Sequence, residues 1–197
     1  MMQGFWSEVM RWAMLGLFGG IVFALIVISF RIQIYRVTGM DVNEEVRRLL
    51  VSDSERVYSF YDKYTLNREI SYLIVNHAVL NRIPVHVFFA VAYTESGFSP
   101  EAVGGPNEDG TYDYSIFQLN SKSYRKYDKA YLCIPENNIR LAAEHLRRNY
   151  DKYKNWPESI IEYNTGTTKL LKARGIKYLV SVLEFTEILD KEFRRCF

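Results

Sequence analysis

The stretch VFFAVAYTESGFSP, residues 87–100, governs how the rest of the sequence is interpreted. Its first half is apolar without interruption, which is typical of a helix buried on all sides. Pro84 is tolerated in the first turn of a helix, whereas Gly97 and Pro100 are suited to ending one. We therefore predict a core helix that begins directly after Pro84 and ends near Glu95. The glutamate needs an explanation, because a carboxylate is costly at the end of a buried segment.

Burial would change the chemistry of Glu95. Desolvation disfavours the charged form of a carboxyl group, and the partial negative charge at a helix C-terminus does so as well. Both effects raise the pKa, and a carboxyl group that stays protonated near neutral pH can act as a general acid. A glycosidic bond needs such a proton donor at its leaving oxygen. An ordinary solvated glutamate just beyond the helix end is the alternative, and both interpretations stay open here.

The segments on either side of this helix are also mostly helical in pattern. Asn67 can cap a helix that follows it. The side chains that this helix would place on one face are Ile70, Leu73, Ile74, His77 and Leu80. Further helices are predicted over residues 139–154, 157–166 and 177–195. Asp109-Gly110 is a turn signal and SIFQLN, residues 115–120, has strand character, so we also predict one small β-hairpin.

Four motifs in this region resemble those of SLT-type lytic transglycosylases and goose-type lysozymes, which cleave the glycan strands of peptidoglycan. The motifs are ESGF at 95–98, SIFQLN at 115–120, PENNIRLAAEHLRRNYDKY at 135–153 and EYNTG at 162–166. In that order they resemble the family's catalytic-glutamate motif, its Gly-Leu-Met-Gln motif, the helix that follows and its Ala-Tyr-Asn-Ala-Gly motif. The resemblance covers about residues 70–171. It implies a lysozyme-like helical fold with Glu95 as the catalytic acid and base.

A second resemblance, to the chicken-type lysozymes, concerns the stretch ESGFSPEAVGGPNEDGTYDYSIFQLNS. It is similar to their glutamate, their Asn-x-Asp-Gly turn and their Asp-Tyr-Gly-Ile-x-Gln-Ile-Asn-Ser segment. Specialised transglycosylases of secretion and conjugation machines carry a similar mixture. The resemblance implies that Asp113 is a second catalytic carboxylate. It would stabilise an oxocarbenium-like transition state or act as a nucleophile, so that water could finish the reaction. A solvated turn aspartate is the alternative.

The resemblance also implies substrate-binding roles for residues of the same motifs. Tyr163 would bring its hydroxyl to the Glu95 carboxyl group or to the N-acetyl group of the sugar. Ser96 would either hydrogen-bond near the reacting sugar or help to end the helix. Gln118 and Asn164 would either contact substrate or tie backbone segments together. The implied chemistry requires no metal and no cofactor.

The sequence departs from the family pattern within two of these motifs. Ser115 replaces the usual Gly, Ile116-Phe117 replaces Leu-Met, and Glu162 and Thr165 replace two alanines. Serine at a tight turn could distort the cleft floor, because Gly permits backbone angles that Ser does not. Glu162 either adds a charge near the site or points to water. These departures leave open a non-catalytic glycan-binding subunit of an envelope-spanning machine.

The N-terminal segment WAMLGLFGGIVFALIVISF, residues 12–30, contains no charged residue. About 20 apolar residues in a helix can span a bilayer core, so we predict a membrane anchor. The alternatives are a cleaved signal peptide, although the segment does not end in a small-residue cleavage site, and a buried helix of a soluble protein. The Lys and Arg count slightly favours a cytoplasmic location for the residues that follow. The location of peptidoglycan outside the cytoplasmic membrane overrides this count, and we expect a single-pass bacterial inner-membrane protein with a periplasmic catalytic domain.

Composition limits the range of partners. The chain has 197 residues with 25 basic and 23 acidic side chains, which are well mixed and give a net charge of +2. No basic stripe indicates nucleic-acid binding. The partners that we expect are peptidoglycan strands, the cytoplasmic membrane and an envelope-spanning secretion or appendage complex. Cys133 and Cys196 could form a disulfide in an oxidising compartment or remain free thiols.

We therefore predict a mainly α (α+β) protein in three parts. These are a membrane anchor within residues 1–36, a juxtamembrane helical stalk at 37–66, and a lysozyme-like transglycosylase domain at 67–197. We expect cleavage of the MurNAc-GlcNAc β-1,4 bond with a 1,6-anhydro product. A hydrolytic lysozyme that uses Glu95 and Asp113 is the alternative, and the sequence leaves open whether chain ends or chain interiors are attacked.

Overall fold

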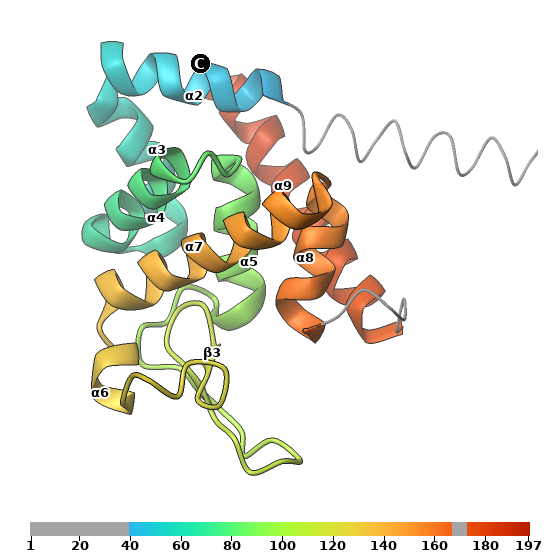
Figure 1. Cartoon of the computed structure of the whole chain (residues 1–197). Helices are drawn as coiled ribbons and strands as arrows, with labels where there is room; N and C mark the ends of the chain where they lie inside the picture. The colour runs from blue at the N-terminus through green and yellow to red at the C-terminus, as the bar shows by residue number, and fades with distance from the viewer. Residues whose placement is uncertain (1–39, 167–172) are drawn as a thin grey trace, which may run out of the picture. The chain divides into compact units, whose positions relative to one another are not determined.

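The computed structural model describes residues 40–166 and 173–197, which group into one compact unit. The domain is mostly helical (Figure 1). Three very short strands lie within residues 103–120. The helices are α2 (Met40–Ser52), α3 (Ser54–Thr65), α4 (Arg68–Leu80), α5 (Val85–Ser96), α6 (Lys129–Leu132), α7 (Pro135–Tyr153), α8 (Trp156–Thr165) and α9 (Ala173–Cys196). The strands are β1 (Val103–Gly104), β2 (Asp113–Tyr114) and β3 (Leu119–Asn120).

Helix α5 is the centre of the domain, as its uninterrupted apolar sequence predicted. All eight residues from Val85 to Ala92 are buried. The helix ends where Gly97 adopts the left-handed conformation with φ of 61°, and the Gly97 N–H donates to the Tyr93 carbonyl at 2.8 Å. This arrangement satisfies a carbonyl group that the last turn would otherwise leave free. The predicted buried helix and its glycine stop are both confirmed.

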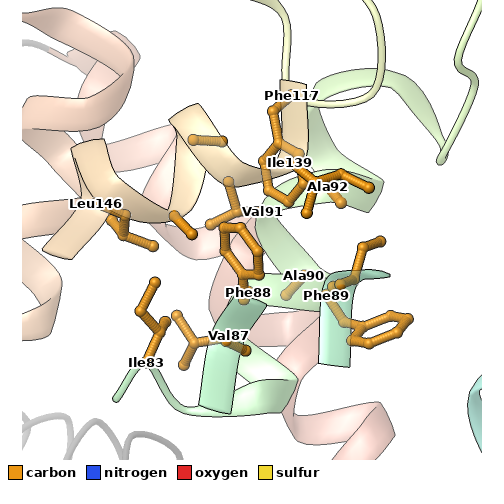
Figure 2. Packing of buried hydrophobic residues seen from close by; sticks show 14 of the residues in the cluster. Ile83, Val87, Phe88, Phe89, Ala90, Val91, Ala92, Phe117, Ile139 and Leu146 are labelled. Atoms are coloured by element: carbon orange, nitrogen blue, oxygen red, sulfur yellow. The ribbon is translucent and has the colours of Figure 1, made fainter. Parts of the chain in front are cut away.

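Helices α4, α7 and α9 and residues of the short strand region pack around α5. The ring of Phe88 stacks on that of Phe117 with centroids 4.3 Å apart, and Ile139 and Leu146 of α7 lie on the same side (Figure 2). Each large apolar side chain buried in this way contributes about 1.5–3 kcal/mol to stability. The packing fixes the direction of α5, and with it the position of the residues in its last turn.

Helix α4 begins where the sequence predicted, because Asn67 caps it. The Asn67 side-chain oxygen accepts hydrogen bonds from the N–H groups of Glu69 and Ile70 at 3.0 and 3.2 Å. The predicted apolar face holds for Ile70, Leu73 and Ile74, which are buried, but it is wrong for Leu80, which is 75% exposed. The helix ends at Leu80, and the left-handed turn at Arg82 then places Ile83 in the core instead.

The segment that the sequence suggested as a stalk is packed on the domain. Helices α2 and α3 contribute four fully or almost fully buried side chains to the common core, namely Val46, Val57, Phe60 and Tyr61. Phe60 meets Phe193 of α9 edge-on at 5.2 Å, and Tyr61 stacks on Phe89 of α5 at 4.3 Å. The apolar faces of these amphipathic helices are therefore covered by the domain.

The predicted hairpin is present and carries a third strand. Strands β1, β2 and β3 pair in that order, antiparallel, with Asp113 opposite Gly104 on one side and Asn120 on the other. The expected turn at Asp109-Gly110 is found. The expected strand over residues 115–120 is wrong except for its last two residues, because Ser115 and Gln118 adopt positive φ and form a tight turn.

The C-terminal half follows the helical prediction, with α7, α8 and α9 in the expected segments. Cys133 follows α6 and Cys196 ends α9, and both are free thiols. Helix α6 and the C-terminus lie at opposite ends of the view in Figure 1, so the disulfide that the sequence left open does not form in this fold.

The predicted membrane anchor, residues 12–30, lies outside the described residues. Among residues 40–166 and 173–197, no helix combines the length and the apolar character needed to cross a bilayer.

Candidate active site

Glu95 lies in the last turn of α5, inside the helix rather than beyond it. Its side chain is mostly buried, and its Oε1 accepts a hydrogen bond of 2.6 Å from the hydroxyl of Tyr178. Tyr178 belongs to α9 and is itself buried, so α5 and α9 are joined by this bond. The solvated glutamate considered from the sequence is therefore not what the structure contains.

The environment of Glu95 raises its pKa from 4.5 to about 7. Burial is the main cause, because it disfavours the charged form. The negative charge of Asp113 raises the pKa further, whereas the Tyr178 hydrogen bond and the positive charge of Arg174 lower it. A carboxyl group with this pKa is protonated for much of the time at neutral pH, which is the state that a general acid requires.

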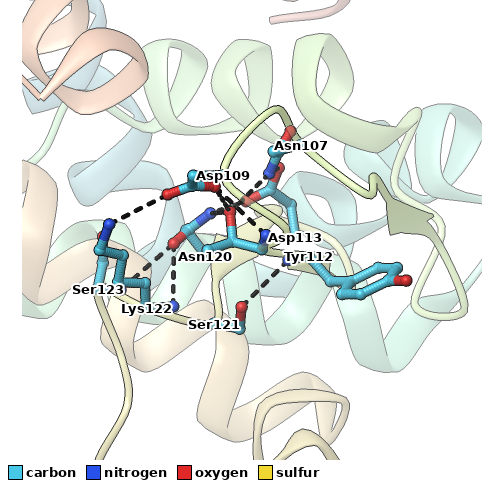
Figure 3. A network of polar contacts seen from close by, with 9 residues as sticks. Asn107, Asp109, Tyr112, Asp113, Asn120, Ser121, Lys122 and Ser123 are labelled. Carbon is cyan, nitrogen blue, oxygen red and sulfur yellow. Dashed lines mark hydrogen bonds and ion pairs between the residues drawn. The ribbon is translucent and has the colours of Figure 1, made fainter.

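Asp113 lies on the central strand β2 and is held by two amide side chains. Asn107 donates to Oδ2 at 2.9 Å, and Asn120 donates to Oδ1 at 2.8 Å (Figure 3). Asn107 comes from the loop between β1 and β2, and Asn120 comes from β3, so the three-stranded sheet fixes both donors. The Asp113 carboxyl group is therefore oriented rather than mobile, and its charge acts on Glu95.

A second set of contacts closes the tip of the hairpin. Thr111 Oγ1 donates to Asp109 Oδ1 at 2.7 Å, and Lys122 Nζ lies 3.2 Å from Asp109 Oδ2. Thr111 Oγ1 also accepts bonds from Asn107 and Asn120, so the tip is joined to the two amides that hold Asp113. The Asp109 carboxylate is thus engaged by a hydrogen bond within its own turn and by the ion pair with Lys122.

Ser96 and Gln118 both tie the strand region to its surroundings. The Ser96 hydroxyl donates to the Ile116 carbonyl at 2.8 Å, which joins the end of α5 to the turn after β2. The Gln118 amide donates to the carbonyls of Ser115 at 2.7 Å and Ala102 at 3.2 Å. A Cβ added to Gly104 would lie 2.6 Å from Gln118 Oε1, so the glycine allows this close packing.

The tight turn contains the serine that replaces the family's glycine. Ser115 is fully buried with φ of 64°, and its Oγ has no hydrogen-bond partner within the described residues. The turn nevertheless keeps its form, because buried Asn138 of α7 holds it. Asn138 accepts from the Phe117 N–H at 2.8 Å and donates to the Tyr114 carbonyl at 2.9 Å.

Tyr163 is close to the site but has a different partner from the one expected. Its hydroxyl donates to the Phe117 carbonyl at 2.9 Å, and the tyrosine bonded to Glu95 is Tyr178. Burial, together with the negative charge of Glu95, raises the pKa of Tyr163 well above its usual value. The Tyr163 hydroxyl therefore stays protonated and holds the tight turn through the Phe117 carbonyl.

Two further residues of the EYNTG motif, Asn164 and Glu162, also have defined positions. Asn164 has a buried side-chain oxygen without a hydrogen-bond partner in the described parts of the chain. Glu162 forms an ion pair with Lys152 of α7 at 3.0 Å. The negative charge of Glu162, which the sequence analysis considered as an added charge near the site, is therefore paired with the charge of Lys152.

The sequence interpretation missed Tyr178, Asn107 and Asn120 as site residues. The two asparagines carried a local signal, since they flank the turn and Asp113 within a short hairpin. Tyr178 carried none, because only the packing of α9 on α5 brings it to Glu95. Within residues 40–166 and 173–197, no cluster of His, Cys, Asp or Glu is arranged to hold a metal ion.

Comparisons with known proteins match the same part of the chain. The family described as Transglycosylase SLT domain matches residues 73–181, which include Glu95, Asp113 and Tyr178. Lysozyme C of Equus asinus is 49% identical over 39 residues, which cover 20% of this chain and 30% of that lysozyme. No solved structure matches. The family match extends over more than half of the chain, so the protein belongs to the SLT transglycosylase domain family, whose members are lytic transglycosylases that act on peptidoglycan.

Proposed function

We propose that this protein is a membrane-anchored lytic transglycosylase in which Glu95 acts first as acid and then as base. The observation that carries the proposal is the mostly buried Glu95 carboxyl group, which accepts a hydrogen bond from Tyr178 and whose pKa burial and the charge of Asp113 raise to about 7. A protonated Glu95 can donate its proton to the oxygen that links MurNAc to GlcNAc, and the bond from that oxygen to the MurNAc C1 then breaks.

The second half of the reaction returns the proton. The Glu95 carboxylate left by the first step accepts the proton of the MurNAc 6-hydroxyl, and the O6 oxygen attacks C1 of the same sugar. The product is a 1,6-anhydro ring, and Glu95 is protonated again for the next cycle. The reaction consumes no water. A pKa near the working pH suits a group that must both give and take a proton.

Asp113 has a supporting part in this proposal. Positive charge develops on the sugar in an oxocarbenium-like transition state, and a fixed negative group nearby stabilises it. The two amide bonds from Asn107 and Asn120 hold the carboxyl group in place before the reaction begins. Little free energy is then needed for reorganisation during the step.

A hydrolytic lysozyme is the second candidate function. Two observations favour it, namely the oriented second carboxylate and the short similarity to a lysozyme C. In that reaction Asp113 would act as the nucleophile or the electrostatic partner, and water would finish the cleavage. The two functions share the substrate and the acid, and they differ in the product.

The test of catalysis separates chemistry from binding. Purified peptidoglycan is incubated with the full chain and with its Glu95→Gln variant, and released fragments are measured beside protein that sediments with the insoluble wall. We expect the variant to bind but to release nothing, because the amide keeps the shape of the carboxyl group without its proton. Fragment release by the variant at the wild-type rate would refute the role of Glu95.

Location is the remaining part of the proposal. We infer that residues 12–30 anchor the chain in the bacterial inner membrane and that the domain faces the periplasm, where its substrate lies. Local opening of the wall for a secretion or appendage complex would suit such an enzyme. Extraction of cell membranes with alkaline carbonate tests the anchor, since an anchored chain stays in the pellet and a chain with a cleaved signal is released.

A further inference from the structure

A second polar contact joins α5 to α9, far from Glu95 along both helices. His86 Nδ1, in the first turn of α5, lies 2.5 Å from Oδ1 of Asp190, near the C-terminal end of α9. Glu95 and Tyr178 form their hydrogen bond near the opposite ends of the same two helices. The two contacts follow opposite orders along the chain, so α9 runs antiparallel to α5. We call His86 and Asp190 the distal pair.

The distal pair is enclosed by the core. The side chains of His86 and Asp190 are 4% and 13% exposed. Three aromatic rings surround the imidazole at centroid distances of 5.3, 5.9 and 6.3 Å, namely those of Phe193, Tyr61 and Phe60. The imidazole Nε2 has no hydrogen-bond partner, so Asp190 is the polar partner of this ring among the described residues. A buried polar group that loses its partner is costly, so the distal pair tolerates little displacement.

Between the two polar contacts, α5 and α9 are joined by an aromatic stack. The ring of Tyr93 in α5 lies on that of Phe185 in α9 with centroids 4.0 Å apart, and Val182 and Leu189 of α9 are buried in the common core. Apolar contacts are non-directional, whereas a hydrogen bond is lost when its atoms move apart by about 1 Å. The two polar contacts therefore specify the axial position of α9 more sharply than the apolar surface does.

The distal pair and the Glu95–Tyr178 bond are linked through the stiffness of the helices. Only a few helical turns separate the two contacts on α5 and on α9. Each residue of an α-helix rises about 1.5 Å, and this rise is fixed by the backbone hydrogen bonds. A slide of α9 at the distal pair is therefore carried along the helix to Tyr178. A misplacement of about 1 Å in a catalytic site can cost on the order of 100-fold in rate.

We propose that the distal pair is a positioning pair, which holds α9 in the register along α5 that places the Tyr178 hydroxyl on the Glu95 carboxyl group. The inference rests on the proposed function, because it concerns the geometry of the same acid. The pair acts on the reaction only through α9 and Tyr178. Apolar side chains of similar volume often stabilise a core as well as a buried polar pair does, so the role of the pair is to specify a position.

The test replaces the distal pair by apolar side chains. His86→Phe/Asp190→Leu removes both polar groups together, so that neither is left buried without a partner. A second apolar pair, His86→Leu/Asp190→Leu, guards against the poor fit of one side chain. Asp190→Asn is the conservative variant, since its amide oxygen can accept the hydrogen bond from the imidazole.

The matched control is Tyr64→Phe. It removes a hydrogen bond of 2.6 Å that joins Tyr64 of α3 to Glu192 of α9, and it leaves the contacts between α5 and α9 in place. For each full-length variant, kcat and KM are measured with soluble glycan strands over a range of pH, and the free energy of unfolding is measured in urea.

We expect both apolar pairs to fold about as stably as the wild type and to keep its KM, while kcat falls several-fold, as in Tyr178→Phe. Adding Tyr178→Phe to either pair should cause no further loss, because both changes remove the same hydrogen bond. The alkaline decline of kcat/KM should move to higher pH, because the bond from Tyr178 lowers the Glu95 pKa. Asp190→Asn and Tyr64→Phe should keep the kcat of the wild type.

Stably folded apolar pairs that keep the wild-type kcat would overturn the proposal, and so would a loss of kcat that adds fully to that of Tyr178→Phe. A decline that moves to lower pH would also overturn it, because water would then have entered the site around Glu95. Failure of both apolar pairs to fold would mean that His86 and Asp190 serve stability, which contradicts the proposal.

Failure of the proposed function looks different from failure of this inference. In that case the wild type would release no fragments, so the pH profile of kcat/KM could not be measured. The titration of Glu95 can still be followed by NMR of its carboxyl carbon, assigned with Glu95→Gln. The inference then predicts a higher Glu95 pKa in both apolar pairs, and an unchanged pKa would contradict it.

Discussion

The two carboxylic side chains of the site occupy opposite kinds of surroundings. Glu95 ends a helix that is apolar on all sides, and burial raises its pKa to about 7. Asp113 lies on a short strand in a loop-rich region, where two asparagine amides donate to its oxygens. The first environment favours the protonated acid, and the second provides donors for a carboxylate.

This difference shows that two regions of the domain hold their carboxyl groups by different physical means. The helical core excludes water from Glu95, and this burial favours the protonated carboxyl group. Ionisation of Glu95 then lowers the stability of the fold. The hairpin supplies a fixed negative group by hydrogen bonding, which depends on local turns. Changes in the two regions should therefore have different signatures, and the following predictions use that contrast.

The largest effect should follow from shortening the acid in the helical region. Glu95→Asp withdraws the carboxyl group from both Tyr178 and the sugar oxygen, and a misplacement of about 1 Å can cost on the order of 100-fold in rate. We expect kcat to fall at least that far, with a circular dichroism spectrum like that of the wild type. A Glu95→Asp variant whose kcat stays close to that of the wild type would show that the position of the acid matters little.

Changing the hairpin region should have a smaller effect on rate and a distinct effect on pH dependence. Asp113→Asn removes a negative charge that raises the Glu95 pKa, so the decline of kcat/KM on the alkaline side should move to lower pH. We expect kcat to fall by roughly 10-fold to 100-fold from the lost electrostatic stabilisation. Rate and pH profile both unchanged would remove Asp113 from the mechanism, and complete inactivity would favour the lysozyme reaction.

Removing the hydroxyl group of Tyr178 in α9 should shift the pH dependence of kcat/KM in the opposite direction. The hydrogen bond from Tyr178 lowers the Glu95 pKa, so Tyr178→Phe should move the alkaline decline of kcat/KM to higher pH. We expect a loss of several-fold in kcat, because the hydrogen bond also orients the carboxyl group. Tyr163→Phe is the matched control, since that hydroxyl donates to the Phe117 carbonyl, and it should leave the alkaline decline where it is.

The raised pKa of Glu95 also predicts a pH-dependent stability difference. Its folded pKa of about 7 exceeds the ordinary 4.5, so its contribution is fully present below about pH 4.5 and is lost as the pH rises through 7. Glu95→Gln should therefore raise the free energy of unfolding at pH 8 by on the order of 1–3 kcal/mol. The difference should shrink toward pH 5 in urea titrations, and a constant difference would contradict the burial argument.

The smallest effect concerns the turn between the two regions. Ser115 is held at φ of 64° with a buried hydroxyl that has no partner in the described residues. Ser115→Gly removes both costs and should stabilise the domain by about 1 kcal/mol, visible as a rise of a few degrees in Tm. Ser115→Ala removes only the hydroxyl and should gain less. A lower Tm for the glycine variant would mean that Ser115 makes a contact that offsets the strain.

Local signals predicted the helical region well. The apolar run, Pro84 and Gly97 are neighbours in the chain, and together they determine where α5 begins and ends and why Glu95 is buried. The hairpin was predicted less completely. Asp109-Gly110 gave the turn, but residues 115–118 form a second turn, because Asn138 from a distant helix holds backbone groups that a strand would pair.

Contacts between distant segments could not be predicted from the sequence. Tyr178 reaches Glu95 only because α9 packs along α5, and no spacing in the sequence indicates which face of α9 does so. The amphipathic pattern of residues 40–65 predicted helices correctly, but it did not indicate which segment of the chain their apolar faces contact. In the structure, Phe60 contacts Phe193, near the other end of the chain.

The most direct test of the central claim is the chemical identity of the glycan ends. Purified peptidoglycan is digested with the full chain, and the products are analysed by mass spectrometry beside a Glu95→Gln digest. The account predicts 1,6-anhydro-muramyl ends that are absent from the Glu95→Gln digest. Reducing ends, heavier by one water, would contradict it and make Asp113 part of a hydrolytic reaction.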